Sequence, residues 1–135
     1  MSTMEILVAT AEREVYSGQA TMLVAPGAAG ELGILPKHSP LLAALNPGEL
    51  RIMHGGEEVD EVFISGGFME VQPDKVTILA DTAERASDMD EAEIVAAQRR
   101  AEEMISSNKG DVDLAMAEAE ISILAARLRL LRKKR

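Results

Sequence analysis

The sequence of 135 residues contains no cysteine and no tryptophan. The absence of cysteine excludes a disulfide framework and every metal site with thiolate ligands. Aromatic side chains are also scarce, since only Tyr16, Phe63 and Phe68 carry one. Hydrophobic residues nevertheless make up 47% of the chain, which is enough for a core. That core must be built from Val, Ile, Leu, Met and Ala side chains.

The chain also lacks an excess of positive charge and a long hydrophobic run. Its formal net charge of −9 argues against nucleic acid as a partner, because neutralising phosphates needs an excess of Lys and Arg. No stretch reaches the roughly 20 apolar residues that span a bilayer. No basic segment followed by an apolar run opens the chain. We expect a soluble, cytoplasmic protein.

Proline and glycine are unevenly distributed and divide the chain into two parts. In the first part they cut the sequence into short apolar runs, which is the pattern of short strands. A turn or a bulge is expected at Ser17 and Gly18, and a turn at Pro26 and Gly27. The expected strands cover residues 4–10, 21–25, about three segments within 30–52, then 58–65, 68–72 and 76–80. Many short strands without an intervening helix predict an antiparallel β-sandwich over residues 1–84.

From Glu84 onward there is no proline and only one glycine, Gly110. The abundant Ala, Glu and Arg favour helix. We expect a first helix capped by Ser87 or Asp88, with Asp90 in its first turn. A second helix begins after Gly110, with Asp111 as its cap. The sequence therefore predicts an antiparallel α-helical hairpin over residues 87–135, and an α+β fold for the whole chain.

The two helices carry apolar stripes of unequal content. The first stripe is Ile94, Ala97, Ala101 and Met104 or Ile105. The second is Leu114, Ala117, Ile121, Leu124, Leu128 and Leu131. A fully buried Leu contributes roughly 1.5–3 kcal/mol, and Ala opposite Leu buries much less. We hypothesise that the hairpin is a marginal, two-state element that leans on the sandwich or on another protein. Hydrogen exchange that protects the second helix as strongly as the core strands would contradict this.

Residues 30–52 contain three glycines and three prolines. Within them, Pro36 and Pro40 enclose the polar residues Lys37, His38 and Ser39. Proline at both ends makes this loop rigid. A rigid polar loop on a strand scaffold is a typical place for a contact with a partner.

Few residues suit catalysis or metal binding. The two histidines, His38 and His54, fall in different expected loops, and we interpret each as a loop residue rather than a base or a ligand. Ser65 precedes two glycines, but the pattern G-x-S-x-G is absent. No phosphate-binding glycine loop is present either. We predict no catalytic residue and no metal site.

Basic residues gather near the end of the second helix, among them Arg127, Arg129 and Arg132. One interpretation is a favourable interaction of these cations with the negative end of the helix dipole. The other is a basic tip that binds an acidic partner. A role at the membrane surface is weaker, because the aromatic side chains expected there are missing.

Several segments, in order over nearly the whole chain, resemble the epsilon subunit of the bacterial F-type ATP synthase. They are Ser17-Gly18, GELGILP at 30–36 with His38 and residues 40–42, residues 47–52, ISGGFMEVQP at 64–73, VTILAD at 76–81, residues 101–103 and GDVD at 110–113. Each segment alone is a weak signal. Their combination and order are specific.

The resemblance implies a β-sandwich and a helical hairpin in a non-catalytic subunit of the rotating central stalk. The complex would translocate protons, and this subunit would lie at the cytoplasmic face of the bacterial membrane, in contact with it only through the complex. The sandwich would bind the gamma subunit and rest on the c-ring. The resemblance implies that Glu31 faces the c-ring loops, and that Lys37 and His38 lie near the same contact.

For the hairpin, the resemblance implies two arrangements. It would fold against the sandwich, or extend along gamma into the catalytic head of alpha and beta subunits and restrain ATP hydrolysis. In the extended arrangement basic residues of the second helix would meet an acidic segment of the beta subunit. The matching candidates are Arg127, Arg129 and Arg132.

Some bacterial members of this family bind ATP through Ile or Leu, Asp, two free positions, Arg and Ala. The matching residues here are MDEAEI at 89–94. Asp90 is kept, but Glu93 replaces the Arg, and a carboxylate repels a phosphate. We therefore expect no cofactor, and weak or absent ATP binding.

Two other functions lead to different expectations. A stand-alone sandwich that binds a peptide or small ligand and dimerises through its hairpin would form a stable homodimer and would not bind gamma. An enzyme would need a pocket with convergent titratable groups, and the sequence indicates none.

Overall fold

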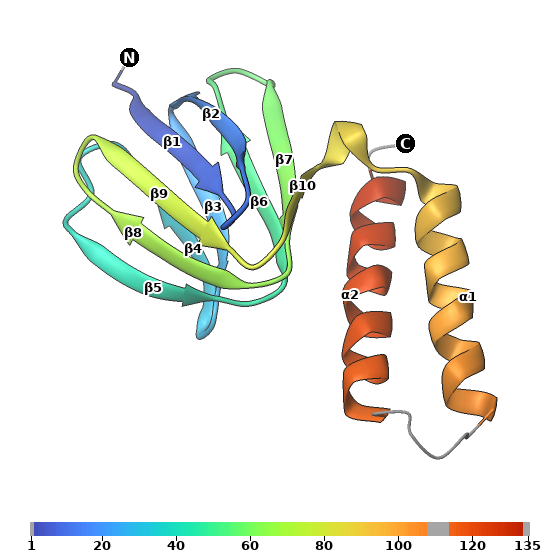
Figure 1. Cartoon of the computed structure of the whole chain (residues 1–135). Coiled ribbons are helices and arrows are strands. Elements are labelled where there is room, and N and C mark those ends of the chain that lie inside the picture. The colour runs from blue at the N-terminus through green and yellow to red at the C-terminus, as the bar shows by residue number, and fades with distance from the viewer. Residues whose placement is uncertain (1, 108–113, 134–135) are drawn as a thin grey trace. The chain divides into compact units, whose positions relative to one another are not determined.

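The computed structural model describes residues 2–107 and 114–133. The chain divides into two compact units, Met1–Asp88 and Met89–Arg135 (Figure 1). The first unit contains the strands, and the second contains two helices. The strands are β1 (Met4–Ala9), β2 (Glu14–Ala20), β3 (Met22–Gly27), β4 (Gly30–Ile34), β5 (Leu41–Leu45), β6 (Gly48–Met53), β7 (Val59–Ile64), β8 (Gly67–Val71), β9 (Lys75–Ala80) and β10 (Ala83–Arg85).

The strands form two layers of one continuous sheet. One layer has the order β10-β7-β6-β3, with β4 also paired to β3. The other has the order β5-β8-β9-β1-β2. The layers join where Gly27 of β3 pairs with Leu45 of β5. With the helical hairpin that follows, this confirms the α+β fold predicted from the sequence.

Alternating side chains fill the space between the layers. In β1, Ile6 and Val8 are fully buried while their neighbours are partly exposed. In β8, Met69 and Val71 point inward and Phe68 points outward. Tyr16 joins this otherwise aliphatic core. The largest fully buried side chains are Met4, Ile6, Leu23, Ile34, Leu50, Ile52, Ile64, Met69 and Ile78.

Two predicted turns are wrong, because the strands run through them. Ser17 and Gly18 lie inside β2, and the irregularity in this ladder falls between Val8 and Ala9 of the partner strand. A Cβ on Gly18 would lie 2.9 Å from the Tyr16 hydroxyl oxygen. Gly18 therefore makes room for that side chain, which is a common reason for glycine within a strand.

The predicted turn at Pro26 and Gly27 is also part of a strand. β3 continues through both residues, and Pro26 faces Glu31 of β4. Proline is tolerated there because it stands next to the end of the strand, where a missing N–H costs little.

Two strand pairings could not be predicted from the local sequence pattern. β1 and β9 pair in parallel, with Ile6 opposite Val76 and Val8 opposite Ile78. The short strand β10 pairs antiparallel with β7 and extends the sandwich to Arg85. Both pairings join segments that are distant in the sequence or too short to show an apolar period.

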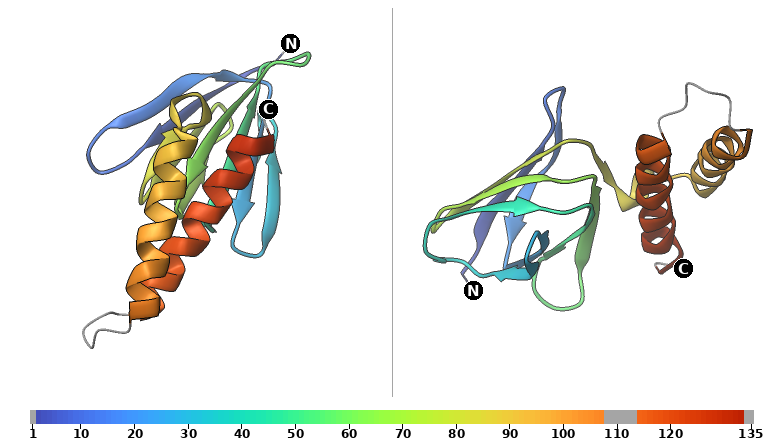
Figure 2. Two further views of the ribbon diagram at one scale, coloured as in Figure 1. Left: turned by 90° about the vertical axis from the view of Figure 1, so that its right-hand side faces the viewer. Right: turned by 90° about the horizontal axis from the view of Figure 1, so that it is seen from below.

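The second unit is an antiparallel pair of helices, α1 (Glu91–Ser107) and α2 (Leu114–Lys133), which lie side by side in both views of Figure 2. The cap predicted at Ser87 or Asp88 is wrong. Ser87 and Asp88 belong to a short 3-10 turn, and Asp90 caps α1, because its Oδ1 accepts a hydrogen bond of 2.9 Å from the Ala92 N–H. The expected cap at Asp111 lies outside the described residues.

The apolar stripes of the helices agree in part with those predicted. In α1, Ile94 and Ala101 are buried, and Ile105 rather than the exposed Met104 continues the stripe. In α2 the buried residues are Ala117, Leu124, Leu128, Leu130 and Leu131. The Leu114 side chain, which the predicted stripe also includes, lies outside the described part of the structure.

Gly67 is the position where the sandwich tolerates a side chain least. Its φ is +146°, and an added Cβ would overlap the carbonyl oxygen of Leu79 and lie 2.8 Å from the Cα of Ala80. Gly56 also has a positive φ, +65°, but nothing lies within 4 Å of its Cβ position.

We predict that Gly56→Ala lowers the free energy of unfolding by about 1–2 kcal/mol, the cost of left-handed backbone. Gly67→Ala should lower the free energy of unfolding clearly more, because steric overlap with the backbone of Leu79 and Ala80 adds to the backbone strain. Equal losses in urea unfolding would contradict this.

Candidate functional site

The three predicted contact residues of the sandwich lie at opposite ends of β4. Glu31 stands at the start of the strand, with a side chain 69% exposed and its Oε1 3.3 Å from Nη2 of Arg51. Lys37 and His38 follow the other end of the strand. The structure therefore does not bring Glu31 together with Lys37 and His38. A contact that uses all three must extend along the whole strand.

The polar loop is held by its backbone. The Lys37 N–H donates a 2.7 Å hydrogen bond to the carbonyl oxygen of Pro73, in the turn between β8 and β9. Lys37 has a φ of 68°, a left-handed conformation that is uncommon for a residue with a side chain. These two features fix the loop and leave the Lys37 side chain exposed.

A shallow, mostly apolar hollow of about 320 Å³ adjoins Glu31. It was not predicted, because it forms between the β3–β4 turn and β5, which are separate in the sequence. Its lining residues are Gly27, Ala28, Ala29, Gly30, Glu31, Leu32, Leu41, Ala43 and Ala44. The small side chains explain the hollow, and Glu31 gives its rim one carboxylate.

An exposed apolar face on β5, β8 and β9 was also missed. Phe68 and Leu79 are each 59% exposed and Leu42 is 71% exposed. Phe68 stands opposite Ala44 on one side and Leu79 on the other. We call Leu42, Ala44, Phe68 and Leu79 the outer apolar face. Neighbouring apolar groups that stay exposed on a sheet commonly mark a protein interface.

His54 lies in the loop between β6 and β7, as interpreted from the sequence, but it is not a plain solvated residue. Its side chain is only 20% exposed, and its Nε2 lies 2.8 Å from Oδ2 of Asp60. The hydroxyl oxygen of Tyr16 lies 3.1 Å from the same carboxylate oxygen and 3.3 Å from the His54 Nε2. The three residues are distant in the sequence, and no local pattern announces their meeting. We call Tyr16, His54 and Asp60 the seam cluster.

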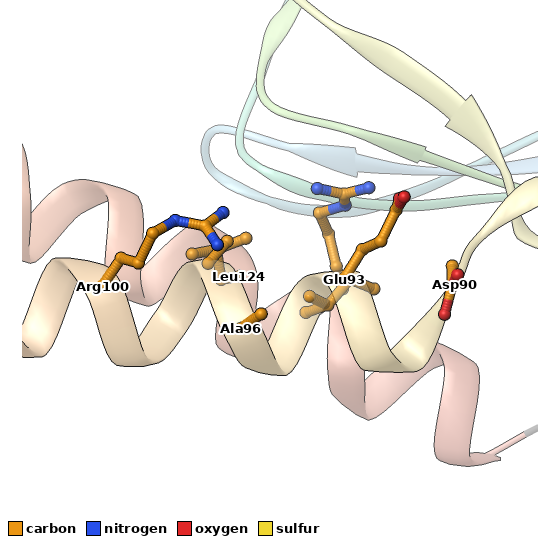
Figure 3. A pocket seen from close by; sticks show the side chains of 8 residues that line it. Asp90, Glu93, Ala96, Arg100 and Leu124 are labelled. Carbon is orange, nitrogen blue, oxygen red and sulfur yellow. The ribbon is translucent and has the colours of Figure 1, made fainter.

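The hairpin contains a pocket of about 440 Å³. Glu93 and Arg100 project from the same side of α1 in Figure 3, and Asp90 stands at the start of the helix. The pocket is lined by Asp90, Glu93, Ile94, Ala96, Ala97, Arg100, Leu124 and Arg127. The predicted nucleotide residue Asp90 is thus part of this pocket, but one of its carboxylate oxygens already caps α1.

The three predicted arginines of α2 do not form one face. Successive residues of a helix are rotated by about 100°, so Arg127 and Arg129 point about 160° apart. Arg127 lines the pocket. Arg129 is exposed. Arg132 forms an ion pair with Glu91 at the start of α1, with 2.9 Å between its Nε and Oε1 of Glu91.

The described residues, 2–107 and 114–133, contain neither a candidate metal site nor a candidate membrane-spanning helix. No group of three or more His, Asp or Glu side chains in them could hold a metal ion. Neither helix in that part of the chain is long and apolar enough to cross a membrane.

Comparison with known proteins gives consistent matches. Residues 3–86 match the family model described as "ATP synthase, Delta/Epsilon chain, beta-sandwich domain". The chain is similar to the ATP synthase epsilon chain of Thioalkalivibrio sulfidiphilus, with 53% identity over 135 residues, covering 98% of this chain and 95% of that one. It is 49% identical to the epsilon chain of Acidithiobacillus ferridurans over 133 residues, covering 98% and 94% of the two chains.

Two solved structures share the fold. One is the Euglena gracilis mitochondrial ATP synthase, described as OSCP/F1/c-ring, with a TM-score of 0.79, 21% identity, and 96% of this chain and 81% of that chain covered. The other is the central stalk and c-ring of the Tetrahymena thermophila mitochondrial ATP synthase, with a TM-score of 0.60, 20% identity, and 96% and 97% covered.

Glu93 is the residue of the pocket that should decide nucleotide affinity. We predict that titration calorimetry of the chain with MgATP shows no micromolar binding. Glu93→Arg, which exchanges a repulsive carboxylate for a phosphate-binding cation, should raise the affinity by at least about tenfold. Glu102→Arg makes the same change of charge on the same helix but outside the pocket, and it should leave the affinity for MgATP unchanged. Micromolar binding by the unmodified chain would contradict the prediction.

Proposed function

This chain belongs to the family of ATP synthase epsilon chains, and we propose that it works as a rotor subunit that joins gamma to the c-ring and restrains ATP hydrolysis through its hairpin. The chain itself is an accessory subunit and not the catalytic one. The observation that carries the proposal is the independence of the sandwich core. Among the described residues, that core is made of residues of the sandwich and includes none beyond Ala83. The sandwich can therefore stay bound while the hairpin changes its packing.

The outer apolar face is the surface we assign to gamma. Phe68 lies at its centre, between Ala44 and Leu79. Exposed aromatic and aliphatic groups at the centre of a patch contribute most of the affinity of a typical interface. The net negative charge of the chain would oppose a purely electrostatic contact with another acidic protein, so apolar burial is the better source of affinity.

The c-ring contact is assigned to the β3–β4 end of the sandwich, with Glu31 at its centre. The carboxylate is exposed, and the apolar hollow beside it offers space for a small side chain of a partner. Lys37 and His38 belong to the opposite end of β4, so they reach the c-ring or gamma only at the periphery of this contact. The chain lies at the cytoplasmic face of the membrane and is held there through the proton-translocating complex.

The hairpin is assigned to the catalytic head. Arg129 is exposed, and Arg132 is 62% exposed but paired with Glu91. Binding of Arg132 to an acidic segment of the beta subunit would exchange one carboxylate for another. Exposed ion pairs are worth at most about 1 kcal/mol, so this exchange of partners costs little.

The alternative of a stand-alone sandwich that dimerises through its hairpin gains no support. The relatives match over almost their whole length, so sandwich and hairpin belong to the epsilon chain together. In the hairpin, α1 and α2 already cover each other's buried stripes. Nothing in the described residues points to a second copy.

The division of labour can be tested with the catalytic head that contains gamma. The full chain and a version ending at Ala86 should both bind, because the outer apolar face is intact in both. Only the full chain should slow ATP hydrolysis, because only it carries α2. Failure of both to bind would contradict the assignment, and inhibition by the shortened version would contradict the role of the hairpin.

The gamma surface can be tested separately. Phe68→Ser should weaken binding to gamma by at least about tenfold, since it removes the centre of the apolar face. Leu35→Ser is the matched control, because Leu35 is 57% exposed but follows β4 in the other layer. Surface plasmon resonance with immobilised gamma measures both. Equal loss of affinity in the two variants would exclude this face as the specific contact.

A further inference from the structure

The two edge strands of the sandwich, β2 and β10, are brought together without a strand pairing. β2 ends one layer and β10 ends the other. Across this seam the guanidinium carbon of Arg85, in β10, lies 5.4 Å from the ring centre of Tyr16, in β2. The hydroxyl of Tyr16 reaches Asp60 of β7. Side chains therefore close the sandwich where backbone hydrogen bonds do not.

His54 makes the polar part of this closure. It follows the last residue of β6, and its ring lies between a backbone group of β2 and the side chain of Asp60. Its Nδ1 is 2.9 Å from the carbonyl oxygen of Gln19, and its Nε2 is 2.8 Å from Oδ2 of Asp60. One histidine thus connects the edge strand β2 with the β6–β7 hairpin.

The partners of the ring determine its protonation state. A carbonyl oxygen can only accept a hydrogen bond, and an ionised carboxylate can only accept one as well. Both ring nitrogens of His54 must therefore donate, which only the imidazolium can do. The Tyr16 hydroxyl then donates to Asp60, since the His54 Nε2 has no free lone pair. This arrangement leaves one positive charge against one negative charge in a half-buried site.

The surrounding charges support the same state. Burial alone would lower the pKa of His54, but hydrogen bonds to Asp60 and to the Gln19 carbonyl, with the charges of Asp60 and Glu58, raise the pKa above its usual 6.5. Burial would raise the pKa of Asp60, but the bonds from His54 and Tyr16, with the nearby charges of His54 and Arg85, hold the pKa below 3.8. Burial and Asp60 raise the pKa of Tyr16 to about 12, so its hydroxyl stays a donor.

We propose that the seam cluster is a proton-operated clasp, in which the His54 imidazolium fastens the edge strand β2 to the β6–β7 hairpin and its deprotonation releases that strand. When His54 loses a proton, the Asp60 carboxylate keeps the remaining hydrogen on Nε2, and Nδ1 becomes an acceptor that faces the carbonyl oxygen of Gln19 in β2. Two acceptors at this distance repel each other. The ring must rotate or withdraw, and the seam then depends on Tyr16 and Arg85 alone.

The direction of the pH dependence follows from linkage. A histidine whose pKa is raised by folding stabilises the folded chain fully below its unfolded pKa of about 6.5. This contribution falls as the pH rises through the folded pKa. The Asp60 contribution has the opposite dependence: it is present above about 3.8 and is lost as the pH falls through the lower, folded value. The clasp is therefore strongest in mildly acidic solution and weakens toward alkaline pH.

The test uses the full chain and two independent measurements. Nitrogen-15 NMR of the imidazole rings gives the titration midpoint of His54 in folded protein and in urea-unfolded protein, and shows whether both nitrogens carry hydrogen at pH 7. Urea unfolding between pH 5.5 and 9 gives the pH dependence of stability. The ratio of folded to unfolded protein should fall about tenfold for each pH unit by which the folded midpoint exceeds the unfolded one.

Substitutions test whether the loss of stability at alkaline pH comes from the seam cluster. His54→Gln should remove this alkaline loss of stability, whereas His38→Gln, which changes the other histidine in the β4–β5 loop, should keep it. Asp60→Asn should lower the His54 midpoint. Amide exchange of β2, corrected for intrinsic rate, should increase at alkaline pH in the unmodified chain. A neutral His54 at pH 7, or an alkaline loss that persists in His54→Gln, would overturn the proposal. The NMR result stands even if a variant fails to fold.

Discussion

Closure of the sandwich along both of its long sides is the constraint on which the rest of this structure depends. On one side the backbone continues from layer to layer, because Gly27 of β3 pairs with Leu45 of β5. On the other side no such ladder connects β2 with β10, and Tyr16, His54 and Asp60 fasten the seam through side chains. With so few aromatic side chains, the aliphatic core supplies apolar burial but little directional contact. Directionality at the open seam is supplied by a hydrogen-bonded ion pair.

A sandwich that closes on its own core leaves the hairpin free to serve another purpose. The helices bury Ile94 and Ala101 against a stripe that includes Leu124 and Leu128, so the facing groups are unequal in size. We expect two helices of 17 and 20 residues with such a seam to be marginal by themselves. The Glu91–Arg132 ion pair adds at most about 1 kcal/mol at an exposed site. Such an element can exchange one packing for another at a small free-energy difference.

The sequence allowed the fold class to be predicted because local patterns carry it. Before Glu84 glycine and proline divide the chain into short apolar runs, and beyond it there is no proline and only one glycine, Gly110. Local patterns could not reveal what depends on segments far apart in the chain. The parallel β1–β9 register is of this kind, and so is the meeting of His54 with Tyr16, 38 positions away. The outer apolar face was missed for another reason, because Phe68 and Leu79 share the outer side of their strands with the polar residues Glu70 and Thr77, and only the register of β8 and β9 brings the two apolar side chains together.

Glu93 affects which ligands can shift the hairpin between its two proposed packings. A ligand shifts an equilibrium only by the difference between its affinities for the two states. If a carboxylate at this position removes nucleotide affinity from the pocket, ATP concentration exerts no bias on the hairpin of this chain. On the proposed function, the bias then comes from contacts between proteins, in which Arg132 would exchange the carboxylate of Glu91 for one of the head. On this argument the balance responds to ionic strength, which screens exposed charge pairs, and to the partner surfaces presented to α2.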